Sequence, residues 1–458
     1  MRFHESFAKD IYWPLAQKLK GQHASRALKE LSESEWQSQD ELLARQWRLV
    51  KRTVNKAFRE VPYYKKICAD IGWEVKNEGF SYEDFVKIPP VEKETLRDRL
   101  SEFLNPHYQG RITEGRTSGS TGHSLTLYYC SEHESYSEAA RWRAKAWWGV
   151  RLGSPQVSVW GRPFTSYSDQ LKQKIKSYLQ NTLIFSAFDL HEKSLAHIWR
   201  QTDRFKPSII YGYPSAILPL AVYLKENKIN AHHLDLKVVM MTAESCPSQQ
   251  RSLIEEIFGC KTANEYGCSE TGGFVYECPE GSWHISNEIT FIEFLDKDLK
   301  PVSAGQTGEI YVTHLRNNYM PLIRYRVGDL GSPLASVCTC GRGLALMQVS
   351  VTKESDVFRL TNGRSYSSEI FDYINLAVIK TYPSSILQFK VIQKALDLFK
   401  VEVVIGQDKS GRGEKLFEQL MRQQLGKDIR IIMRRVPKIA RESSGKLRYF
   451  ISNLSGSH

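Results

Sequence analysis

Short apolar runs alternate with helical stretches between residues 157 and 267. Four runs have the length and residue types of strands, namely VSVWG (157–161), PSIIYGY (207–213), KVVMMTAES (237–245) and KTANEYG (261–267). Intervening segments such as DQLKQKIKSYLQ and SQQRSLIEEIFG carry apolar residues at helical spacing. This alternation favours a largely parallel sheet covered by helices, with ligands bound beyond the carboxyl ends of the strands, where AES and EYGCSE fall.

The regions on either side follow different patterns. Residues 1 to about 75 show helical spacing of apolar residues, with a break at Pro62. Over about 285–351 the runs ITFIEFLD and GEIYVTHL suggest antiparallel strands, and after 351 the order is strand, strand, helix, strand. We therefore predict an α/β protein with an N-terminal core over 1–351, in which a helical leader and a β-rich part flank mixed, mostly parallel sheets and helices. A small α+β C-terminal domain should follow over 352–458.

Charge leaves several classes of partner open. The 458 residues carry a formal net charge of +12, with no long tract of Lys or Arg. A nucleotide, a nucleic acid, an acidic membrane surface or a sugar polymer would suit this charge, and so would a basic surface that is merely solvated. We favour the solvated surface and expect no nucleic-acid partner.

A soluble, cytoplasmic protein is expected from three features. The segment MRFHESFAKD lacks the apolar core of a signal peptide. The most apolar run, residues 208–224, contains Pro214 and Pro219, which favours a strand, a turn and a buried helix over a membrane span. Eight cysteines are spread along the chain, which is typical of free or metal-bound thiols in a reducing compartment.

The segment TSGSTG (117–122) has two interpretations. A run of Gly, Ser and Thr is typical of a flexible linker. The same small residues would also allow backbone N–H groups to converge on phosphate, with hydroxyls as further donors. The Walker spacing G-x-x-x-x-G-K-[ST] is absent.

Three more segments accompany it, namely NEYGCSETGG (264–273), PLIRYRVGDLG (321–331) and RESSGKLRYF (441–450). In this order, on an α/β core with a small C-terminal domain, the four segments resemble the motifs of the adenylate-forming (acyl-activating) superfamily. The resemblance is closest to its phenylacetate–CoA ligase branch, including the CapK-like capsule-biosynthesis proteins. VPYYKK and CTCGR add to the resemblance, which runs from about residue 55 to the C-terminus.

The resemblance implies an ATP-dependent carboxylate-activating ligase. Such enzymes join a carboxylic acid to the α-phosphate of ATP, release pyrophosphate, and transfer the acyl group to an acceptor. ATP and Mg²⁺ are the expected cofactors, and CoA is the first acceptor to consider. The residues that the resemblance assigns to ATP or AMP are Thr117, Ser118, Gly119, Ser120, Thr121, Gly122, Ala243, Glu244, Ser245, Glu265, Tyr266, Gly267, Ser269, Asp329 and Lys353.

Individual roles follow from the matched positions. Tyr266 resembles the residue that stacks on adenine, and the backbone of Ala243 to Ser245 would form the other side of the slot. Glu270 resembles the carboxylate that holds Mg²⁺, an ion that needs only one or two protein carboxylates. Asp329 matches the carboxylate that accepts hydrogen bonds from both ribose hydroxyls.

Lys446 in SGKLR matches a lysine that enters from the family's mobile C-terminal lid. There it neutralises charge between the attacking carboxylate and the α-phosphate. Lys446 and Glu270 are therefore the expected catalytic residues. The hinge should lie near 351–359, where Lys353 stands in place of an arginine that touches ribose or phosphate.

The chain departs from the family pattern after the phosphate loop. His123 and Ser124 replace the usual Lys-Pro, which removes a positive charge and predicts weaker ATP binding. Near Asp329, both Arg324 and Arg326 could meet phosphate or brace the loop, and we favour bracing for Arg326.

Four potential metal ligands form a separate set. Cys278 and His284 form a C-x₅-H pair, and Cys338 and Cys340 form a C-x-C pair. Four such ligands suit a closed, structural zinc site, and similar cysteines occur in some members of the resembled branch. Free buried thiols and a satisfied histidine are an equal alternative. Cys268 lies within the nucleotide motif, and we interpret it as a packing residue rather than a nucleophile.

The carboxylic acid is expected to bind among aromatic and small residues, namely Trp160, Arg162, Tyr211, Tyr213 and Gly272. An aryl acid, a small acid or a sugar acid would fit such a lining. Arg162 could meet a second negative charge or form a surface pair.

Two alternatives to a CoA ligase stay open. The first is an amide ligase that transfers the acyl group to an amine, such as a sugar or sugar nucleotide in capsule or O-antigen polysaccharide biosynthesis. The second is a non-catalytic nucleotide- or polyanion-binding protein. It is disfavoured because Glu270, Asp329 and Lys446 are all present.

Overall fold

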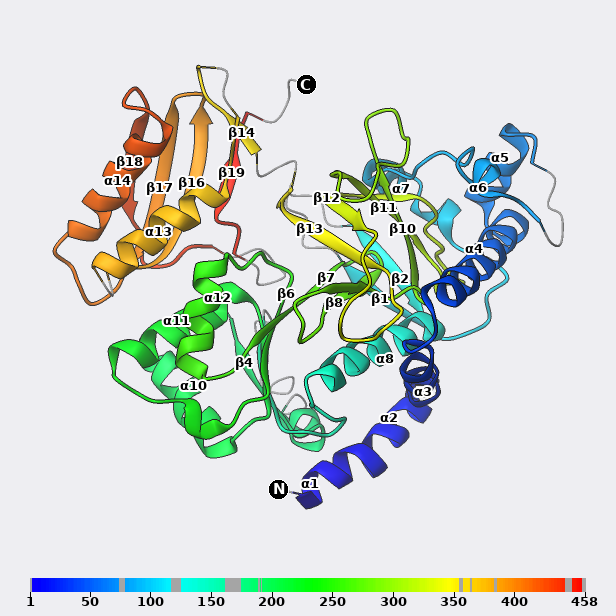
Figure 1. Ribbon diagram of the computed structural model, residues 1–458, viewed down its shortest axis with the longest axis horizontal. Helices are drawn as coiled ribbons and strands as arrows, with labels where there is room; N and C mark the ends of the chain where they lie inside the picture. The colour runs from blue at the N-terminus through cyan, green and yellow to red at the C-terminus, as the bar shows by residue number, and fades with distance from the viewer. Residues whose placement is uncertain are drawn as a thin grey trace. The chain divides into compact units, whose positions relative to one another are not determined.

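The computed structural model describes residues 2–73, 79–116, 125–160, 174–187, 190, 192–353, 357–362, 365–382, 385–440 and 447–454. The chain, coloured from blue to red in Figure 1, forms two compact units. The first comprises Met1–Ser154, Tyr178–Asn181 and Ala263–Ser350. The second comprises Pro155–Ser177, Thr182–Thr262 and Val351–His458, and therefore includes the C-terminal domain.

Helices dominate the start of the first unit, as predicted. Ser38 and Glu41 form a capping box: the N–H of Glu41 donates to Ser38 Oγ at 3.3 Å, and the N–H of Ser38 donates to Glu41 Oε2 at 2.9 Å. The long helix that they begin ends at Glu60, and Pro62 opens the next one, where its missing N–H costs nothing. The helices of this unit are α1 (Arg2–Phe7), α2 (Trp13–Lys20), α3 (Ala24–Ser34), α4 (Gln39–Glu60), α5 (Pro62–Asp70), α6 (Tyr82–Phe85), α7 (Lys93–Asp98) and α8 (Ser131–Trp147), with a π-helical turn at Ala8–Tyr12 and a 3₁₀ turn at Leu100–Phe103.

The sheet of the first unit is built mainly from antiparallel neighbours. Its strands, in spatial order, are β10 (Thr290–Leu295), β11 (Gly308–His314), β12 (Tyr325–Leu334), β13 (Leu346–Lys353), β9 (Trp283–Ile285), β8 (Gly272–Glu277) and β7 (Thr262–Cys268). The predicted antiparallel pair is confirmed, because Thr290 of β10 faces His314 of β11. A separate hairpin pairs β1 (Ile112–Arg116) with β2 (Thr126–Cys130).

The parallel sheet predicted for the central region lies in the second unit. Its strands run in the order β6 (Val238–Thr242), β5 (Ile209–Gly212), β3 (Gln156–Trp160) and β4 (Thr182–Ser186), and these neighbours are parallel. The helices α10 (Glu192–Phe205), α11 (Pro214–Glu226) and α12 (Ser248–Phe258) alternate with the strands, and a 3₁₀ turn spans His232–Leu234. Apolar residues of both layers, such as Ile210, Val239 and Leu220, form one buried core.

The C-terminal part of the second unit has its own sheet, drawn in orange and red in Figure 1. The predicted strand–strand–helix–strand order is confirmed as β16 (Ile386–Ala395), β17 (Leu398–Ile405), α14 (Arg412–Leu425) and β18 (Arg430–Arg435). The structure adds β14 (Val357–Arg359), β15 (Ser365–Ser367), α13 (Glu369–Thr381) and β19 (Phe450–Ser452). Four phenylalanines, Phe358, Phe371, Phe399 and Phe450, pack together in its core.

No helix among the described residues has the length and apolar character needed to cross a bilayer.

A buried ion pair ties α3 and α8 to the loop before β10. Arg143 Nη1 donates to Glu288 Oε1 at 2.9 Å, and each of the two side chains is 1% exposed. Ser34 Oγ donates to the same oxygen at 2.5 Å. Burial alone would raise the pKa of Glu288, but Arg143 and Ser34 outweigh it, so the pKa is lowered.

We expect Arg143→Leu to lower the free energy of unfolding by about 3–5 kcal/mol at pH 7, because it leaves the Glu288 carboxylate buried without a countercharge. Since the pKa of Glu288 is depressed in the folded state, the stabilisation is present above the unfolded pKa and is lost as the pH falls below it. Urea denaturation at several pH values measures both effects.

Lys225→Ala is the matched control, because Lys225 and Glu256 form an exposed pair that should contribute less than about 1 kcal/mol. Equal losses in the two variants would contradict the structural role of the buried pair.

Candidate active site

The motif NEYGCSETGG folds into the β7–β8 hairpin of the first unit. Cys268 faces Gly272 and Gly267 faces Gly273, with a bulge between Tyr266 and Gly267. A Cβ on Gly267 would lie 2.2 Å from the carbonyl oxygen of Gly272, and Gly272 itself has a φ of +81°. Only glycine allows this approach of the two strands, so the motif's glycines fix the hairpin's geometry.

Glu270 lies in the short loop of this hairpin and is 6% exposed. Its Oε1 accepts a hydrogen bond from the Tyr325 hydroxyl at 2.9 Å and lies 3.5 Å from Lys93 Nζ. Burial, and then the charge of Glu270, raises the pKa of Tyr325, so Tyr325 stays a neutral donor. Among the described residues no hydrogen bond or ion pair involves Oε2, and a cation could use that oxygen.

Sequence reasoning missed both partners of Glu270. Tyr325 lies inside the segment RYRVGDLG, but nothing in the sequence predicted that its hydroxyl would contact Glu270. Lys93 opens α7, in a segment that has no motif. Only the folded chain brings this lysine to the hairpin.

Tyr266 and Asp329 are brought together from positions 63 residues apart. The Tyr266 hydroxyl donates to Asp329 Oδ2 at 3.0 Å. Burial and then the Asp329 charge raise the pKa of Tyr266 well above 10. The residues assigned to adenine and to ribose thus lie side by side in the first unit.

The other hairpin residues assigned to ATP have structural contacts. A Cβ on Gly273 would lie 2.6 Å from Glu265 Oε1, and Arg141 Nε lies 3.7 Å from Glu265 Oε2. The backbone carbonyl of Ser269 accepts a hydrogen bond from the Tyr129 hydroxyl at 2.6 Å. The Tyr129 bond holds the hairpin loop against β2, and the Arg141 contact joins β7 to α8.

Two polar side chains of α8 approach Gly272, which was assigned to the acid pocket. A Cβ on Gly272 would lie 3.2 Å from Ser137 Oγ and 3.7 Å from His133 Nε2. Within the described part of the chain, Ser137 Oγ and His133 Nδ1 are buried without a hydrogen-bond partner. Burial lowers the pKa of His133 to about 3, so the imidazole is neutral near pH 7.

The two arginines beside Asp329 brace the fold. Arg324 is buried, and its Nε donates to Glu293 Oε2 at 3.0 Å. Arg326 makes a bidentate pair with Glu309, with donor–acceptor distances of 2.7 and 2.6 Å. The bracing role favoured for Arg326 agrees with this geometry, and Arg324 has the same role.

In the second unit, AES directly follows β6, so it lies at the carboxyl end of a parallel strand. Three aromatic rings stack in the same unit, from Trp160 of β3, Tyr211 of β5 and Tyr213 just before α11. The ring centroids of Trp160 and Tyr211 are 5.6 Å apart, and those of Trp160 and Tyr213 are 4.5 Å apart. The predicted aromatic pocket residues of this unit therefore form one cluster.

Several assigned residues lie outside the described residues, namely Thr117, Ser118, Gly119, Ser120, Thr121, Gly122, His123, Arg162 and Lys446. Lys353 is described only as the last backbone position of β13.

The two predicted pairs of metal ligands meet in the first unit. Donor atoms of Cys278, His284, Cys338 and Cys340 all lie within 4.8 Å of one another. The sulfurs of Cys278 and Cys338 are 3.7 Å apart, and Cys340 Sγ lies 3.4 Å from His284 Nε2. A tetrahedral zinc with Zn–S bonds of about 2.3 Å would set its sulfurs about 3.8 Å apart. The cluster therefore fits zinc in ligand type, number and spacing.

Two family models match the chain. The model described as AMP-binding enzyme matches residues 181–317, and the one described as CapK C-terminal domain matches residues 367–453. Protein CapK of Staphylococcus aureus is 26% identical over 378 residues, which cover 80% of each chain. Phenylacetate-coenzyme A ligase of Thermus thermophilus is 27% identical over 353 residues, 75% of this chain and 77% of that protein.

A crystal structure of 2-hydroxyisobutyryl-CoA ligase in the postadenylation state, in complex with 2-HIB-AMP, superposes with a TM-score of 0.68. It is 19% identical and the match covers 90% of this chain and 89% of that chain, so the two share a fold. Two matched domains in the expected order, relatives that span most of the chain, and this shared fold agree with one another. These findings agree with the resemblance seen in the motifs: the chain has an AMP-binding enzyme domain followed by a CapK C-terminal domain, and it is similar to phenylacetate-coenzyme A ligases and to Protein CapK.

Proposed function

We propose that the protein activates a carboxylic acid with ATP and transfers the acyl group to CoA. The observation that carries the proposal is the geometry of Glu270, a buried carboxylate whose Oε1 contacts Tyr325 and Lys93, whereas no residue that the structure describes makes such a contact with Oε2. The adjacent Tyr266–Asp329 pair supports a nucleoside at the same hairpin.

In the first half-reaction a carboxylate oxygen of the acid attacks the α-phosphorus of ATP. The bond from that phosphorus to the bridging oxygen breaks, and pyrophosphate leaves. Mg²⁺, when bound, would neutralise phosphate charge, and Glu270 is the residue that would hold it. Asp329 would accept from the ribose hydroxyls, and Lys446 would stabilise the charge that develops at the α-phosphate.

In the second half-reaction the CoA thiolate attacks the acyl carbonyl carbon, and AMP leaves. The phenylacetate–CoA ligases among the relatives support CoA as the acceptor. The acid itself would lie near Gly272, where His133 and Ser137 offer polar atoms. This supports testing acids that carry a hydrogen-bonding group beside aryl acids.

A second candidate keeps the adenylate and uses an amine acceptor. The match to the CapK C-terminal domain and the similarity to S. aureus CapK support it. Indoleacetate–lysine synthetase of Pseudomonas savastanoi, 26% identical over 270 residues, adds a relative named for an amine acceptor. An amino sugar or sugar nucleotide in capsule or O-antigen synthesis would be the acceptor, and products formed with CoA or with amines separate the two candidates.

Carboxylate-dependent exchange between ATP and labelled pyrophosphate tests activation, with a panel of aryl, hydroxy and sugar acids. We expect Lys446→Ala and Glu270→Gln each to lower exchange by about 100-fold or more, because each removes charge stabilisation at the phosphates. Asp298→Asn is the control, since Asp298 lies on an exposed turn.

Unchanged exchange in Lys446→Ala would remove that residue's catalytic role. ATP binding without exchange for any acid would favour the non-catalytic alternative.

The proposal needs no covalent cysteine intermediate, and the state of Cys268 agrees. Burial, and then Glu270, raises the pKa of the Cys268 thiol to about 12. At pH 8 its thiolate fraction should be about a thousandfold below that of a free cysteine.

Alkylation of the folded protein with iodoacetamide should therefore be at least about 100-fold slower at Cys268 than in urea, as measured by peptide mass spectrometry. Rapid alkylation of the folded protein, with loss of exchange activity, would instead mark a reactive thiol.

We also infer that Cys278, His284, Cys338 and Cys340 hold one structural zinc ion. A closed set of four protein ligands leaves no position for substrate, so the ion would stabilise the fold. The donor distances support this inference.

Protein purified without added zinc should contain about one equivalent by elemental analysis. Cys338→Ser with Cys340→Ser should reduce it to below about half an equivalent and lower the melting temperature, because metal binding contributes folding energy. Cys260→Ser is the matched control, since Cys260 lies outside the cluster. Less than about half an equivalent in the unmodified protein would contradict the inference.

A further inference from the structure

Glu244 accepts hydrogen bonds from two other segments of the second unit. Its Oε2 accepts from the N–H of Ser215 at 3.0 Å, and its Oε1 accepts from the hydroxyl of Ser215, also at 3.0 Å. Oε1 further accepts from the N–H of Leu447 at 2.9 Å, 203 positions later in the chain. One carboxylate thus joins the end of a parallel strand to the start of α11 and to the C-terminal domain.

Two local features constrain this side chain, namely the backbone turn before it and the start of α11. Ala243, just before it, has a φ of +68°, a left-handed conformation that costs a residue with a Cβ about 1–2 kcal/mol. The surrounding turn therefore imposes this backbone conformation on Ala243. Ser215 is the second residue of α11, and N–H groups in a first helical turn have no partner within the helix. A carboxylate at this end is also stabilised by the helix dipole, so Glu244 is a fixed acceptor.

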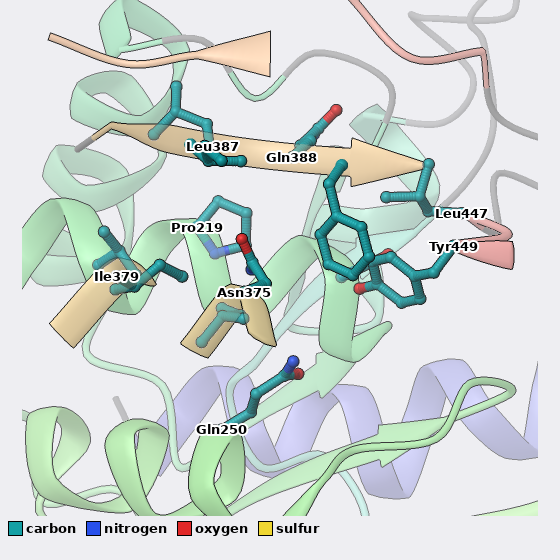
Figure 2. A pocket seen from close by; sticks show the side chains of 13 residues that line it. Pro219, Gln250, Asn375, Ile379, Leu387, Gln388, Leu447 and Tyr449 are labelled. Atoms are coloured by element: carbon teal, nitrogen blue, oxygen red, sulfur yellow. The ribbon is translucent and has the colours of Figure 1, made fainter. Parts of the chain in front are cut away.

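Leu447 lies at the contact between the two parts of this unit (Figure 2). Leu447 is 4% exposed and borders a cavity of about 30 Å³. Pro219 of α11 lines one side, and Ile379, Leu387 and Tyr449 of the C-terminal domain line the other. A cavity of this size has room for about one water, so the apolar surfaces are in close contact.

Apolar contact is non-directional and tolerates sliding of one surface over the other. A hydrogen bond to a charged acceptor is directional and short. The bond from Leu447 N–H to Glu244 is therefore a directional contact that fixes the chain at Leu447 relative to the end of β6. Lys446, the predicted catalytic lysine, is the residue directly before Leu447.

We propose that Glu244 is a positioning residue that anchors the backbone at Leu447 and thereby delivers Lys446 for adenylation. The proposal rests on the proposed function, in which Lys446 acts at the α-phosphate. It also gives Glu244 a role for its side chain, whereas the family resemblance assigns only backbone contacts to AES.

This role predicts an effect on one half-reaction only. Lys446 is needed when the acid attacks ATP, because charge develops there. Attack of the acceptor on a preformed acyl-adenylate does not use Lys446 in the proposed function. Loss of the anchor should therefore lower the fraction of molecules competent for adenylation without slowing acyl transfer.

The experiment compares full-length Glu244→Ala, Glu244→Gln and Ser215→Ala with Glu256→Gln, an exposed carboxylate paired with Lys225 in the same unit. Adenylation is followed by pyrophosphate exchange, and transfer by product formation from synthetic acyl-adenylate plus acceptor. For Glu244→Ala we expect exchange to fall about 10- to 100-fold, the worth of a charge-assisted hydrogen bond, with transfer within about threefold.

The other variants should lose less pyrophosphate exchange than Glu244→Ala. Glu244→Gln should be intermediate, because its amide nitrogen cannot accept the bond that Oε1 or Oε2 accepts. Ser215→Ala should lower exchange less than Glu244→Ala, since the Leu447 bond survives. Glu256→Gln should match the unmodified protein.

Amide hydrogen exchange of the peptide that contains Leu447 is measured on the same proteins. We expect at least about tenfold faster exchange in Glu244→Ala than in Glu256→Gln. Equal losses in both half-reactions would make Glu244 merely structural and overturn the proposal, as would unchanged amide exchange. If no acid supports activity in any protein, the proposed function fails, while the amide exchange still decides whether the anchor exists.

Discussion

The approach of two backbones at Gly267 is the constraint on which the candidate site depends. A side chain there would meet the carbonyl of Gly272 at 2.2 Å, so the hairpin closes only with glycine at this position. Closure sets the bulge after Tyr266 and the loop that carries Glu270. Because bulges re-aim side chains beside active sites, one local requirement places both the ring assigned to adenine and the carboxylate assigned to Mg²⁺.

Holding Glu270 in place raises a second physical problem, the cost of burying a charge. The side chain is almost fully covered, and burying an isolated charge is costly. Lys93 and the Tyr325 hydroxyl both compensate the charge at one oxygen. Both contacts of the described residues lie at Oε1, and the proposed function assigns the other oxygen to Mg²⁺. Lys93 is 43% exposed, so its own charge stays partly solvated.

The sequence predicted the architecture well because periodicity and turn residues are local signals. The parallel order of β3, β5 and β6, the break at Pro62 and the antiparallel β10–β11 pair all follow from such signals. Contacts between distant segments could not be foreseen in the same way. Neither Lys93 nor Tyr325 carries a motif of its own, and their meeting with Glu270 depends on tertiary packing. The cysteine–histidine cluster is an intermediate case, since ligand types suggested zinc but only the fold brings the two pairs within 4.8 Å.

Glu244 and Glu270 show why residue type and motif alone do not define a role. Both lie in segments assigned to ATP, and both are glutamates just beyond a β-strand. Glu244 accepts from the N–H and the hydroxyl of Ser215 at the start of α11 and from the N–H of Leu447, so both of its oxygens bind the protein itself. Among the described residues, Glu270 contacts the Lys93 ammonium and the Tyr325 hydroxyl, both at Oε1. The donors around each carboxylate therefore decide that the first can order the chain while the second can bind an ion, a distinction that depends on tertiary contacts and that sequence alone does not carry.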